Sequence, residues 1–298
     1  MTDSTTSRAA LVTGCSSGIG RATAERLAAT GWTVYATARK PETLRDLEAR
    51  GCRTLALDVT DEASMQAAVA AVEGEHGAVG ALVNNAGYSQ SGAIETVPLE
   101  KVRAQFETNV FGLVRLTQLV LPAMRRARAG KIVNLSSMGG KLVFPGGGFY
   151  HATKHAVEAI SDALRFEVKG FGVDVIVIEP GLIKTAFGTT ASSGVSEAGA
   201  DERSGDEASG RGSGDYAQFN AHVARATESV YEKGSPVGRL GGPPEAVAKV
   251  IDKALSAKRP RARYTVTPSA KLLLAQRALL PDRGWDAVMR SQFPQPGR

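Results

Sequence analysis

The stretch Thr13-Gly14-Cys15-Ser16-Ser17-Gly18-Ile19-Gly20 decides the fold class of this chain. An apolar run from Ala9 to Val12 precedes it and an amphipathic run from Gly18 to Thr30 follows, which predicts a buried strand, a glycine-rich turn and a helix. Glycines let the backbone approach a phosphate closely, and the first turn of a helix offers unpaired N–H groups to an anion. The stretch therefore predicts a dinucleotide site. Because its glycine spacing differs from Gly-x-Gly-x-x-Gly, a plain strand–helix connection remains the alternative for this stretch alone.

The rest of the chain repeats this alternation of short apolar runs and longer amphipathic runs. Strands are predicted at residues 9–12, 33–37, 55–57, 81–83, 131–135, 173–178 and 263–266. Helices are predicted at 18–30, from Pro41, from a capping Thr60, at 99–127 with Pro122 inside, and at 150–169. Strands that alternate with helices form right-handed βαβ units. We therefore expect an α/β, Rossmann-type doubly wound parallel sheet of about seven strands with helices on both faces, as a single domain over residues 1–298.

Composition and charge exclude several classes of protein. The chain has 298 residues, 43% hydrophobic and 22% charged, which excludes a disordered, collagen-like or coiled-coil protein. The net charge of +6 permits an anionic cofactor, and no recognition motif accompanies it, so no nucleic-acid partner is expected. Cys15 and Cys52 form neither a disulfide framework nor a metal cluster, and no metal is expected. With no secretory pattern at its start and no run near the roughly 18 apolar residues of a membrane span, the chain is expected to be cytoplasmic.

Tyr150 and Lys154 are the candidate acid/base pair. They are four residues apart, so on the predicted helix they share one face. A neighbouring ammonium group favours the phenolate and lowers the pKa of a tyrosine, which makes the phenol usable as an acid or base near neutral pH. Taken alone, such a pair is more often an ordinary surface pair.

Several separated motifs together resemble those of the short-chain dehydrogenase/reductase family, over nearly the whole chain. In chain order they are Thr13-Gly14-x3-Gly18-Ile19-Gly20, Asp58, Asn84-Asn85-Ala86-Gly87, Asn109, Ser136-Ser137, Tyr150-x3-Lys154 and Pro180-Gly181. The branch that the chain resembles most is the NADP-preferring steroid and retinol dehydrogenase type. Each motif alone could be an ordinary structural feature, but their occurrence together in this order favours the family resemblance.

The resemblance implies a role for each catalytic residue. Tyr150 would donate the proton in reduction, and Lys154 would lower the pKa of Tyr150 and hold the nicotinamide ribose. Ser137, which precedes Tyr150 by 13 residues, would hydrogen-bond the substrate oxygen, with Ser136 as the alternative. Asn109 would anchor a water that relays protons through Lys154.

The resemblance also implies a cofactor site at the ends of the strands. Asp58 and Val59 would contact adenine, Asn84, Ala86 and Gly87 would line the cleft, and Pro180 to Thr185 would lie beside the nicotinamide. The full set of expected cofactor-binding residues is Gly14, Ser16, Ser17, Gly18, Ile19, Gly20, Arg39, Asp58, Val59, Asn85, Ala86, Gly87, Tyr150, Lys154, Pro180, Gly181, Ile183 and Thr185.

Arg39 decides the expected choice of cofactor. An acid at the end of the second strand would bind the ribose hydroxyls of NAD, but there is no carboxylate from Val34 through Lys40. The planar, permanently charged fork of Arg39 suits a 2′-phosphate instead, and Lys40 adds a second positive charge. NADP(H) is therefore the preferred cofactor and NAD(H) the alternative; the bland interpretation is a solvated basic pair.

The expected function is NADP(H)-dependent interconversion of a secondary alcohol and a ketone or aldehyde on a bulky apolar substrate. The alternative is a non-catalytic NADP(H) sensor on the same fold. A homodimer or homotetramer is expected from the family, through the helix at 99–127 and the Tyr150 helix. Met138, Val143, Phe144, Phe149 and Phe187 are candidates for the pocket wall, with ordinary core packing as the alternative for each.

Two segments depart from the regular alternation. A flexible substrate lid is expected around residues 182–240, because Gly188 to Asp215 is rich in glycine, serine and acids. A C-terminal extension at 268–298 contains five leucines between 272 and 280, which are too apolar for a free tail. We expect it to pack near the pocket mouth, while weak contact with a membrane surface or a partner subunit stays an alternative because basic residues accompany the leucines.

Overall fold

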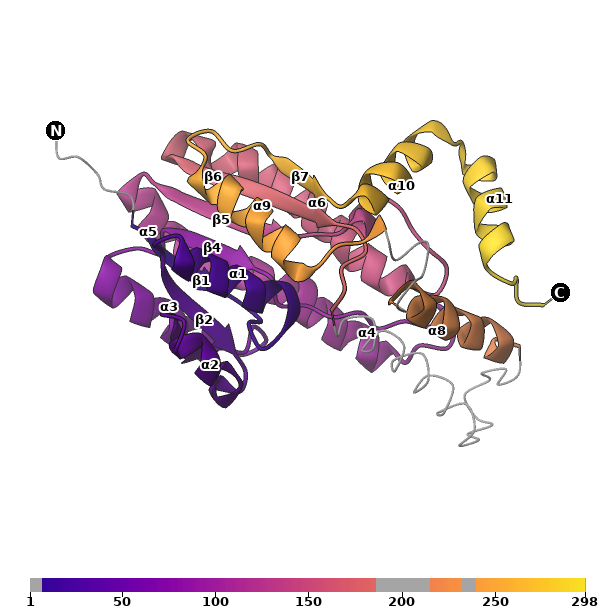
Figure 1. Ribbon diagram of the computed structural model, residues 1–298, viewed down its shortest axis with the longest axis horizontal. Coiled ribbons are helices and arrows are strands. Elements are labelled where there is room, and N and C mark those ends of the chain that lie inside the picture. The colour runs from indigo at the N-terminus through magenta and orange to yellow at the C-terminus, as the bar shows by residue number, and fades with distance from the viewer. Residues whose placement is uncertain (1–6, 186–214, 232–239, 298) are drawn as a thin grey trace.

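The computed structural model describes residues 7–185, 215–231 and 240–297, which fold around one parallel β-sheet (Figure 1). Seven strands pair in the order β3-β2-β1-β4-β5-β6-β7. The strand bounds are β1 Ala9–Val12, β2 Thr33–Ala38, β3 Arg53–Ala56, β4 Ala81–Asn84, β5 Gly130–Leu135, β6 Val173–Pro180 and β7 Arg263–Val266. The chain order reverses between β1 and β4, which is the switch point where doubly wound sheets bind their ligands.

Helices cover both faces of this sheet, as Figure 1 shows. The helix bounds are α1 Gly18–Ala29, α2 Arg45–Glu48, α3 Glu62–His76, α4 Leu99–Phe106, α5 Gly112–Ala127, α6 Gly148–Val168, α8 Ala217–Tyr231, α9 Pro244–Ser256, α10 Pro268–Leu279 and α11 Asp282–Gln292. Alternate residues of β1 enter separate cores: Ala10 and Val12 pack with α1 and α9, and Leu11 packs with α3 and α5. This two-sided burial explains why the central strands are apolar at nearly every position.

The predicted architecture is confirmed, with small differences at the ends of elements. β7 has the predicted bounds, β6 continues to Pro180, and β3 begins at Arg53. The helix predicted from Thr60 begins at Glu62, and its capping residue is Asp61, whose carboxylate accepts a hydrogen bond from Ser64 N at 2.7 Å. Thr60 is therefore not the cap; its own N–H and hydroxyl both donate to Asp58.

The long helix predicted at 99–127 is interrupted by one wide turn. Between α4 and α5 the residues Glu107–Phe111 form a π-helix, and Pro122 lies inside α5 as expected. A π-turn inserts one extra residue per turn and often marks a functional site. Here it contains Asn109, one of the predicted catalytic residues.

Three helices of the C-terminal part of the chain, α8, α10 and α11, lie at one end of the molecule (Figure 1). α11 packs through Trp285 and Met289 against Leu142 after β5, and Phe293 contacts the α8 residues Phe219 and Val223. The C-terminal segment therefore belongs to the same folded unit. No helix within the described residues is long and apolar enough to cross a membrane. Most of the predicted lid, including residues 188–214, lies outside the described residues.

Candidate active site

The glycine-rich turn joins β1 to α1 at the switch point of the sheet. Gly14 and Gly18 have φ angles of +70° and +58°, a left-handed conformation that suits glycine. Gly20 is needed for space, because a Cβ atom there would overlap the Gly14 carbonyl. The Cys15 N–H donates to Thr37 O at 2.8 Å, and so ties the turn to the end of β2. The turn is a backbone cradle at a helix N-terminus, which fits the pyrophosphate of a dinucleotide.

Thr13 and Asn85 clamp this turn to the segment after β4. The Thr13 hydroxyl accepts hydrogen bonds from the N–H groups of Asn85 and Ala86, both at 2.9 Å. In return, Asn85 Nδ2 donates to Thr13 O at 2.9 Å and Gly14 O at 3.1 Å. These six groups all lie where the carboxyl ends of β1 and β4 meet, so the two motifs form one structural unit.

Asn84 faces away from this unit. Its amide is buried and donates to Thr117 Oγ1 at 3.1 Å and to Asn134 Oδ1 at 3.0 Å, and Asn134 in turn donates to Ser161 Oγ. The chain of amides links β4 and β5 to helices α5 and α6. These partners hold the Asn84 side chain in the interior, so a contact of this residue with a cofactor would have to come from its backbone.

The residues expected around adenine and the 2′-phosphate follow β2 and β3. Arg39, Lys40, Ser16 and Ser17 are exposed, whereas Thr37 at the end of β2 is buried. After β3, Asp58 is half-buried and accepts two hydrogen bonds from Thr60. Val59 is buried, and its carbonyl packs on Gly112, where any side chain would overlap it.

Tyr150 and Lys154 come together in the first turns of α6. Lys154 Nζ lies 5.7 Å from the centroid of the Tyr150 ring and donates to Leu135 O, at the end of β5, at 2.7 Å. Burial lowers the pKa of Lys154 to about 8, and the charge of Glu158, one turn further along α6, opposes that effect. Lys154 is thus held beside Tyr150. Its pKa of about 8 means that it changes its charge near neutral pH.

Ser137 is accessible and Ser136 is not. Ser137 is half-buried, accepts a hydrogen bond from Gly139 N at 3.1 Å and lies 3.5 Å from Pro180 O. The Ser136 hydroxyl is fully buried beneath Gly140. Of the two serines, Ser137 is the one whose hydroxyl can meet a substrate.

Asn109 lies next to this pair, inside the π-turn. Its Oδ1 accepts from Tyr88 N at 3.0 Å, and its Nδ2 donates to Tyr88 O at 2.9 Å and Thr153 Oγ1 at 3.1 Å. A Cβ atom on Gly87 would lie 3.0 Å from Asn109 Oδ1 and 3.8 Å from Lys154 Nζ. Gly87, Asn109 and Lys154 therefore converge on one point, where the described structure brings three predicted site residues together.

The segment after β6 reaches the same edge of the sheet. Gly181 N donates to Val266 O at 3.1 Å, and Ile183 forms an isolated bridge with Gly242. Thr185 lies over the glycine turn, because a Cβ atom on Gly18 would be 3.2 Å from its methyl group. The expected nicotinamide-side segment thus approaches the phosphate turn.

Sequence reasoning missed the residues that hold this segment. Thr267 and Ser269, at the start of α10, surround Gly181 so closely that a side chain there would overlap them. Ser269 Oγ also accepts a hydrogen bond from Leu182 N at 3.3 Å. Thr267 has a φ of +84°, which is rare for a residue with a side chain. No sequence motif predicts the contact of Thr267 and Ser269 with Gly181.

His151 follows Tyr150 on α6 and has specific surroundings. It is buried, its Nδ1 lies 3.1 Å from Gly139 O, and burial lowers its pKa to about 4. Its ring contacts Tyr150 and Phe144 edge-on, and Phe144 contacts Trp285 of α11. A chain of aromatic rings therefore joins the C-terminal helix to the candidate acid/base.

Among the expected pocket-wall residues, Met138 is buried, Phe144 and Phe149 are half-buried and Val143 is exposed, while Phe187 lies outside the described residues.

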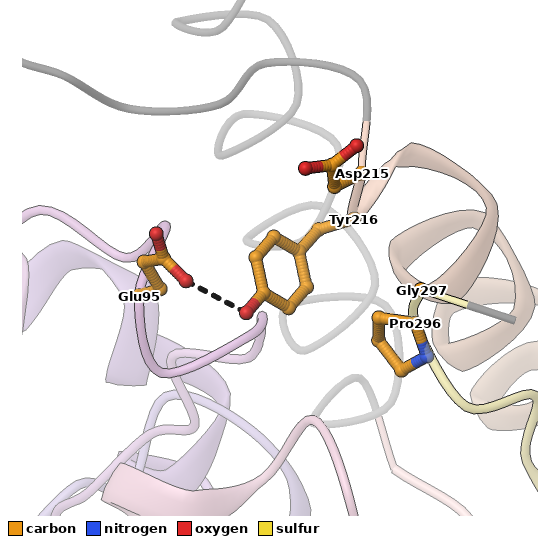
Figure 2. Close-up of a pocket in the computed structure, with 5 residues that line it drawn as sticks. All are labelled: Glu95, Asp215, Tyr216, Pro296 and Gly297. Atoms are coloured by element: carbon orange, nitrogen blue, oxygen red, sulfur yellow. Dashed lines mark hydrogen bonds between the residues drawn. The ribbon is translucent and has the colours of Figure 1, made fainter.

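A separate hollow of about 280 Å³ lies between the loop after β4, the start of α8 and the C-terminal end (Figure 2). Tyr216 donates to Glu95 Oε2 at 2.7 Å there. None of the predicted catalytic residues lines that hollow. No cluster of potential metal ligands occurs within the described residues.

Comparison with known proteins assigns the family. The family model for short chain dehydrogenases matches residues 8–195. The chain belongs to the short-chain dehydrogenase family. It is an oxidoreductase of the kind that acts on alcohol and keto groups, on a fold that binds NAD(P).

Three relatives of this short-chain dehydrogenase illustrate the likeness. An NADPH-dependent 3-dehydrocapnine reductase of Ornithobacterium rhinotracheale is 39% identical over 94% of this chain and 95% of its own. A 3-ketodihydrosphingosine reductase of Bacteroides thetaiotaomicron is 36% identical, with 94% and 96% covered. The crystal structure of a short-chain dehydrogenase from Streptomyces avermitilis is 34% identical, with a TM-score of 0.73 and 95% and 97% of the chains covered.

Proposed function

We propose that this protein is an NADPH-dependent reductase of a ketone carried on a long apolar chain, with Tyr150 as proton donor. The observation that carries the proposal is the convergence of Tyr150, Lys154, Asn109 and Gly87 at the switch point, beside a glycine turn that fits a pyrophosphate. The names of two relatives support the substrate class, since they are reductases of 3-dehydrocapnine and of 3-ketodihydrosphingosine.

Each catalytic residue has a proposed task in this reaction. NADPH, when bound, supplies the hydride. Tyr150 donates its phenolic proton to the carbonyl oxygen as negative charge develops there, and the Ser137 hydroxyl donates a second hydrogen bond to the same oxygen. The ammonium group of Lys154 lies near enough to favour the phenolate that remains on Tyr150. Asn109 fixes the Tyr88 backbone and Thr153 around the lysine, and is proposed to anchor the water that returns the proton.

The cofactor residues are proposed from the cradle and its rim. Gly14, Gly18 and Gly20, with the neighbouring Ser16, Ser17 and Ile19, would hold the pyrophosphate, and Asp58 and Val59 would flank adenine. Asn85, Ala86 and Gly87 would form the floor, and Pro180, Gly181, Ile183 and Thr185 the nicotinamide side. Arg39 is exposed beside the turn, where its guanidinium can bind a 2′-phosphate bidentately, so NADP(H) is proposed as the preferred cofactor.

A homo-oligomer and a single domain with a substrate lid at 182–240 complete the proposal. Phe111, at the end of the π-turn, and Phe166, on α6, are 54% and 87% exposed, and both lie on the helices expected to form the contact between copies. A contact between copies through these helices would remove both phenylalanine side chains from water.

Turnover of a defined ketone tests the proposal. Purified protein should oxidise NADPH with long-chain 3-keto amines and lose at least about 100-fold in rate in Tyr150→Phe, with NADPH affinity retained. Tyr264→Phe is the matched control, because Tyr264 is a half-buried tyrosine of β7 whose hydroxyl accepts from Arg261 N. Near-normal rates in Tyr150→Phe would overturn the mechanism. NADPH binding without turnover of any ketone would instead favour a non-catalytic sensor.

A further inference from the structure

The helix α10 has apolar side chains on two opposite faces. On the inner face Ser269 and Ala270 are buried, and Leu273 and Leu274 pack against the cluster around Trp285. Two other leucines, Leu272 and Leu279, are 59% and 83% exposed. They are seven residues apart, so they lie two turns apart on one side of the helix. Packing within the chain accounts for the inner leucines and leaves the outer ones in water.

Exposed positive charges accompany these leucines along α10 and α11. Lys271, Arg283 and Arg290 are exposed on α10 and α11. Arg277 donates to Asp282 at 2.7 Å and lies over the Trp285 ring, so the charge of Asp282 is balanced within the chain. Asp286 is the remaining acid of α11. The hairpin thus presents leucines with a surplus of cations.

We propose that the outer face of α10 and its turn into α11 dock on an anionic lipid bilayer. A helix with exposed leucines flanked by lysine and arginine is the pattern of segments that lie in the headgroup region. The two helices stand at the end of the molecule, beyond the sheet (Figure 1). This inference rests in part on the proposed function, because a ketone on a long alkyl chain resides in membranes.

Another exposed leucine shows that exposure alone does not make such a face. Leu99, at the start of α4, is 55% exposed, nearly the same as Leu272. Its charged neighbours in sequence balance one another, because the acids Glu95 and Glu100 are matched by Lys101 and Arg103. The charge around the leucine therefore separates the proposed docking face from an ordinary exposed side chain.

The α10 face also joins the candidate active site through the folded chain. Thr267 and Ser269 at the start of α10 pack on Gly181, and Trp285 contacts Phe144, which contacts His151 beside Tyr150. A bilayer held by α10 and α11 would therefore lie next to the elements that surround the proposed substrate site. A lipid ketone would have only a short way to travel out of the membrane.

Co-sedimentation with vesicles tests the docking. Full-length protein should bind vesicles of phosphatidylcholine mixed with phosphatidylglycerol, and bind phosphatidylcholine alone much less. The double variant Leu272→Ser/Leu279→Ser should reduce the partition constant of the protein onto vesicles roughly tenfold or more. A fully inserted leucine favours the membrane by a factor of roughly ten to a hundred, which the serine removes. Arg283→Gln/Arg290→Gln should reduce it by about fivefold per charge on anionic vesicles only.

Leu99→Ser is the matched control and should bind vesicles like the parent protein. Turnover of a short, water-soluble ketone should be the same in all these variants, which shows that they are folded. Equal vesicle binding by the α10 double variant and the parent would overturn the docking. The docking would also be overturned if the α10 double variant changed its oligomeric state, measured by light scattering, and not its vesicle binding. The outer face of α10 would then be a contact between copies of the chain.

The outcomes also separate this inference from the proposed function. Protein that reduces long-chain ketones in detergent but ignores vesicles keeps the function and loses the docking. Protein that binds anionic vesicles through α10 but reduces no long-chain ketone keeps the docking and loses the proposed substrate class.

Discussion

The glycine turn at 13–20 and the C-terminal pair of helices α10 and α11 follow the carboxyl ends of different strands, β1 and β7, and are held by different forces. The turn is fixed by hydrogen bonds among backbone groups, Thr13 and Asn85. The hairpin is fixed mainly by apolar packing of Trp285 and Met289 against Leu142. Directional bonds to the backbone require particular residues at particular positions, whereas apolar packing requires only volume and shape.

This difference explains why a sequence motif predicts the glycine turn and none predicts the packing of α10 and α11. Few residue types can serve at a position that needs a hydroxyl group, an amide group or, as at a glycine, the absence of a side chain. Where a side chain must only fill space, leucine, methionine and phenylalanine are nearly interchangeable. The cofactor side of the site can therefore be located from the sequence, while the substrate side depends on packing.

The largest effect is expected from removing the centre of the hairpin. Trp285→Ala deletes the contact with Phe144 and the hydrogen bond from Trp285 Nε1 to Val143 O, 3.3 Å long. We expect a loss of about 3–5 kcal/mol of local stability, measured by hydrogen exchange of α11, with the NADPH dissociation constant unchanged. Leu279→Ala, at an exposed position, should cost less than about 0.5 kcal/mol. Weaker NADPH binding in Trp285→Ala would show that the two regions are coupled.

On the cofactor side, Arg39→Asp should erase or reverse the preference for NADP(H). A charge-assisted contact to the 2′-phosphate is worth about 1.5–3 kcal/mol, or roughly tenfold to a hundredfold in the ratio of dissociation constants. Titration of both cofactors measures the ratio, and turnover at saturation should change little. Arg45→Asp, an equal charge reversal at an exposed position of α2, should leave the ratio alone. An unchanged ratio in Arg39→Asp would make Arg39 a solvated surface charge.

Two glycine substitutions compare the tolerance of the regions directly. Gly20→Ala places a methyl group against the Gly14 carbonyl, and overpacking of this kind costs about 1–3 kcal/mol. We expect weaker NADPH binding and a lower melting temperature. In the hairpin, a Cβ atom on Gly284 would lie 3.3 Å from the flexible end of Leu280, so Gly284→Ala should be accepted. Equal effects of the two changes would contradict the contrast between backbone and side-chain packing.

The smallest effect is expected from Glu158→Gln, as a shift of a pH profile. The pKa of Lys154 is about 8, and Glu158 is the charge that favours its ammonium form. The reduction rate, which requires that charge, should fall as the pH rises through about 8 in the parent protein. Without the carboxylate the pKa of Lys154 decreases further, so the fall should move to lower pH, by less than about one unit.

Glu179→Gln is the control for this shift. Glu179 is a buried acid that, like Glu158, contacts Arg263, but it lies on β6 and not on the helix of Lys154. It should leave the profile in place while disturbing the same ion cluster. A profile that is identical in Glu158→Gln and the parent would show that Glu158 does not influence Lys154.

Some features could be predicted from single residues and others could not. Tyr150 and Lys154 are recognisable because their spacing puts them on one helix face, and the strands because their apolar runs are short and bounded. The π-turn at Asn109 has no such signal: the residues 107–111 suit an ordinary helix, and contacts of Asn109 with Tyr88 and Thr153 accompany the wider turn. The cap of α3 was assigned to Thr60 instead of Asp61, because neighbouring oxygens compete for the same N–H groups.

The sequence by itself determined the parallel α/β sheet, the glycine turn between β1 and α1, and the placement of Tyr150 and Lys154 on one helix face, because each depends on residues that are close in the chain or on a periodic pattern. Only the tertiary structure decided which of Ser136 and Ser137 is accessible, where Asn84 points, and which leucines of α10 are buried. These depend on which surfaces face each other after folding. A side chain's neighbours from distant elements set its burial and its hydrogen bonds, and a linear pattern contains no record of them.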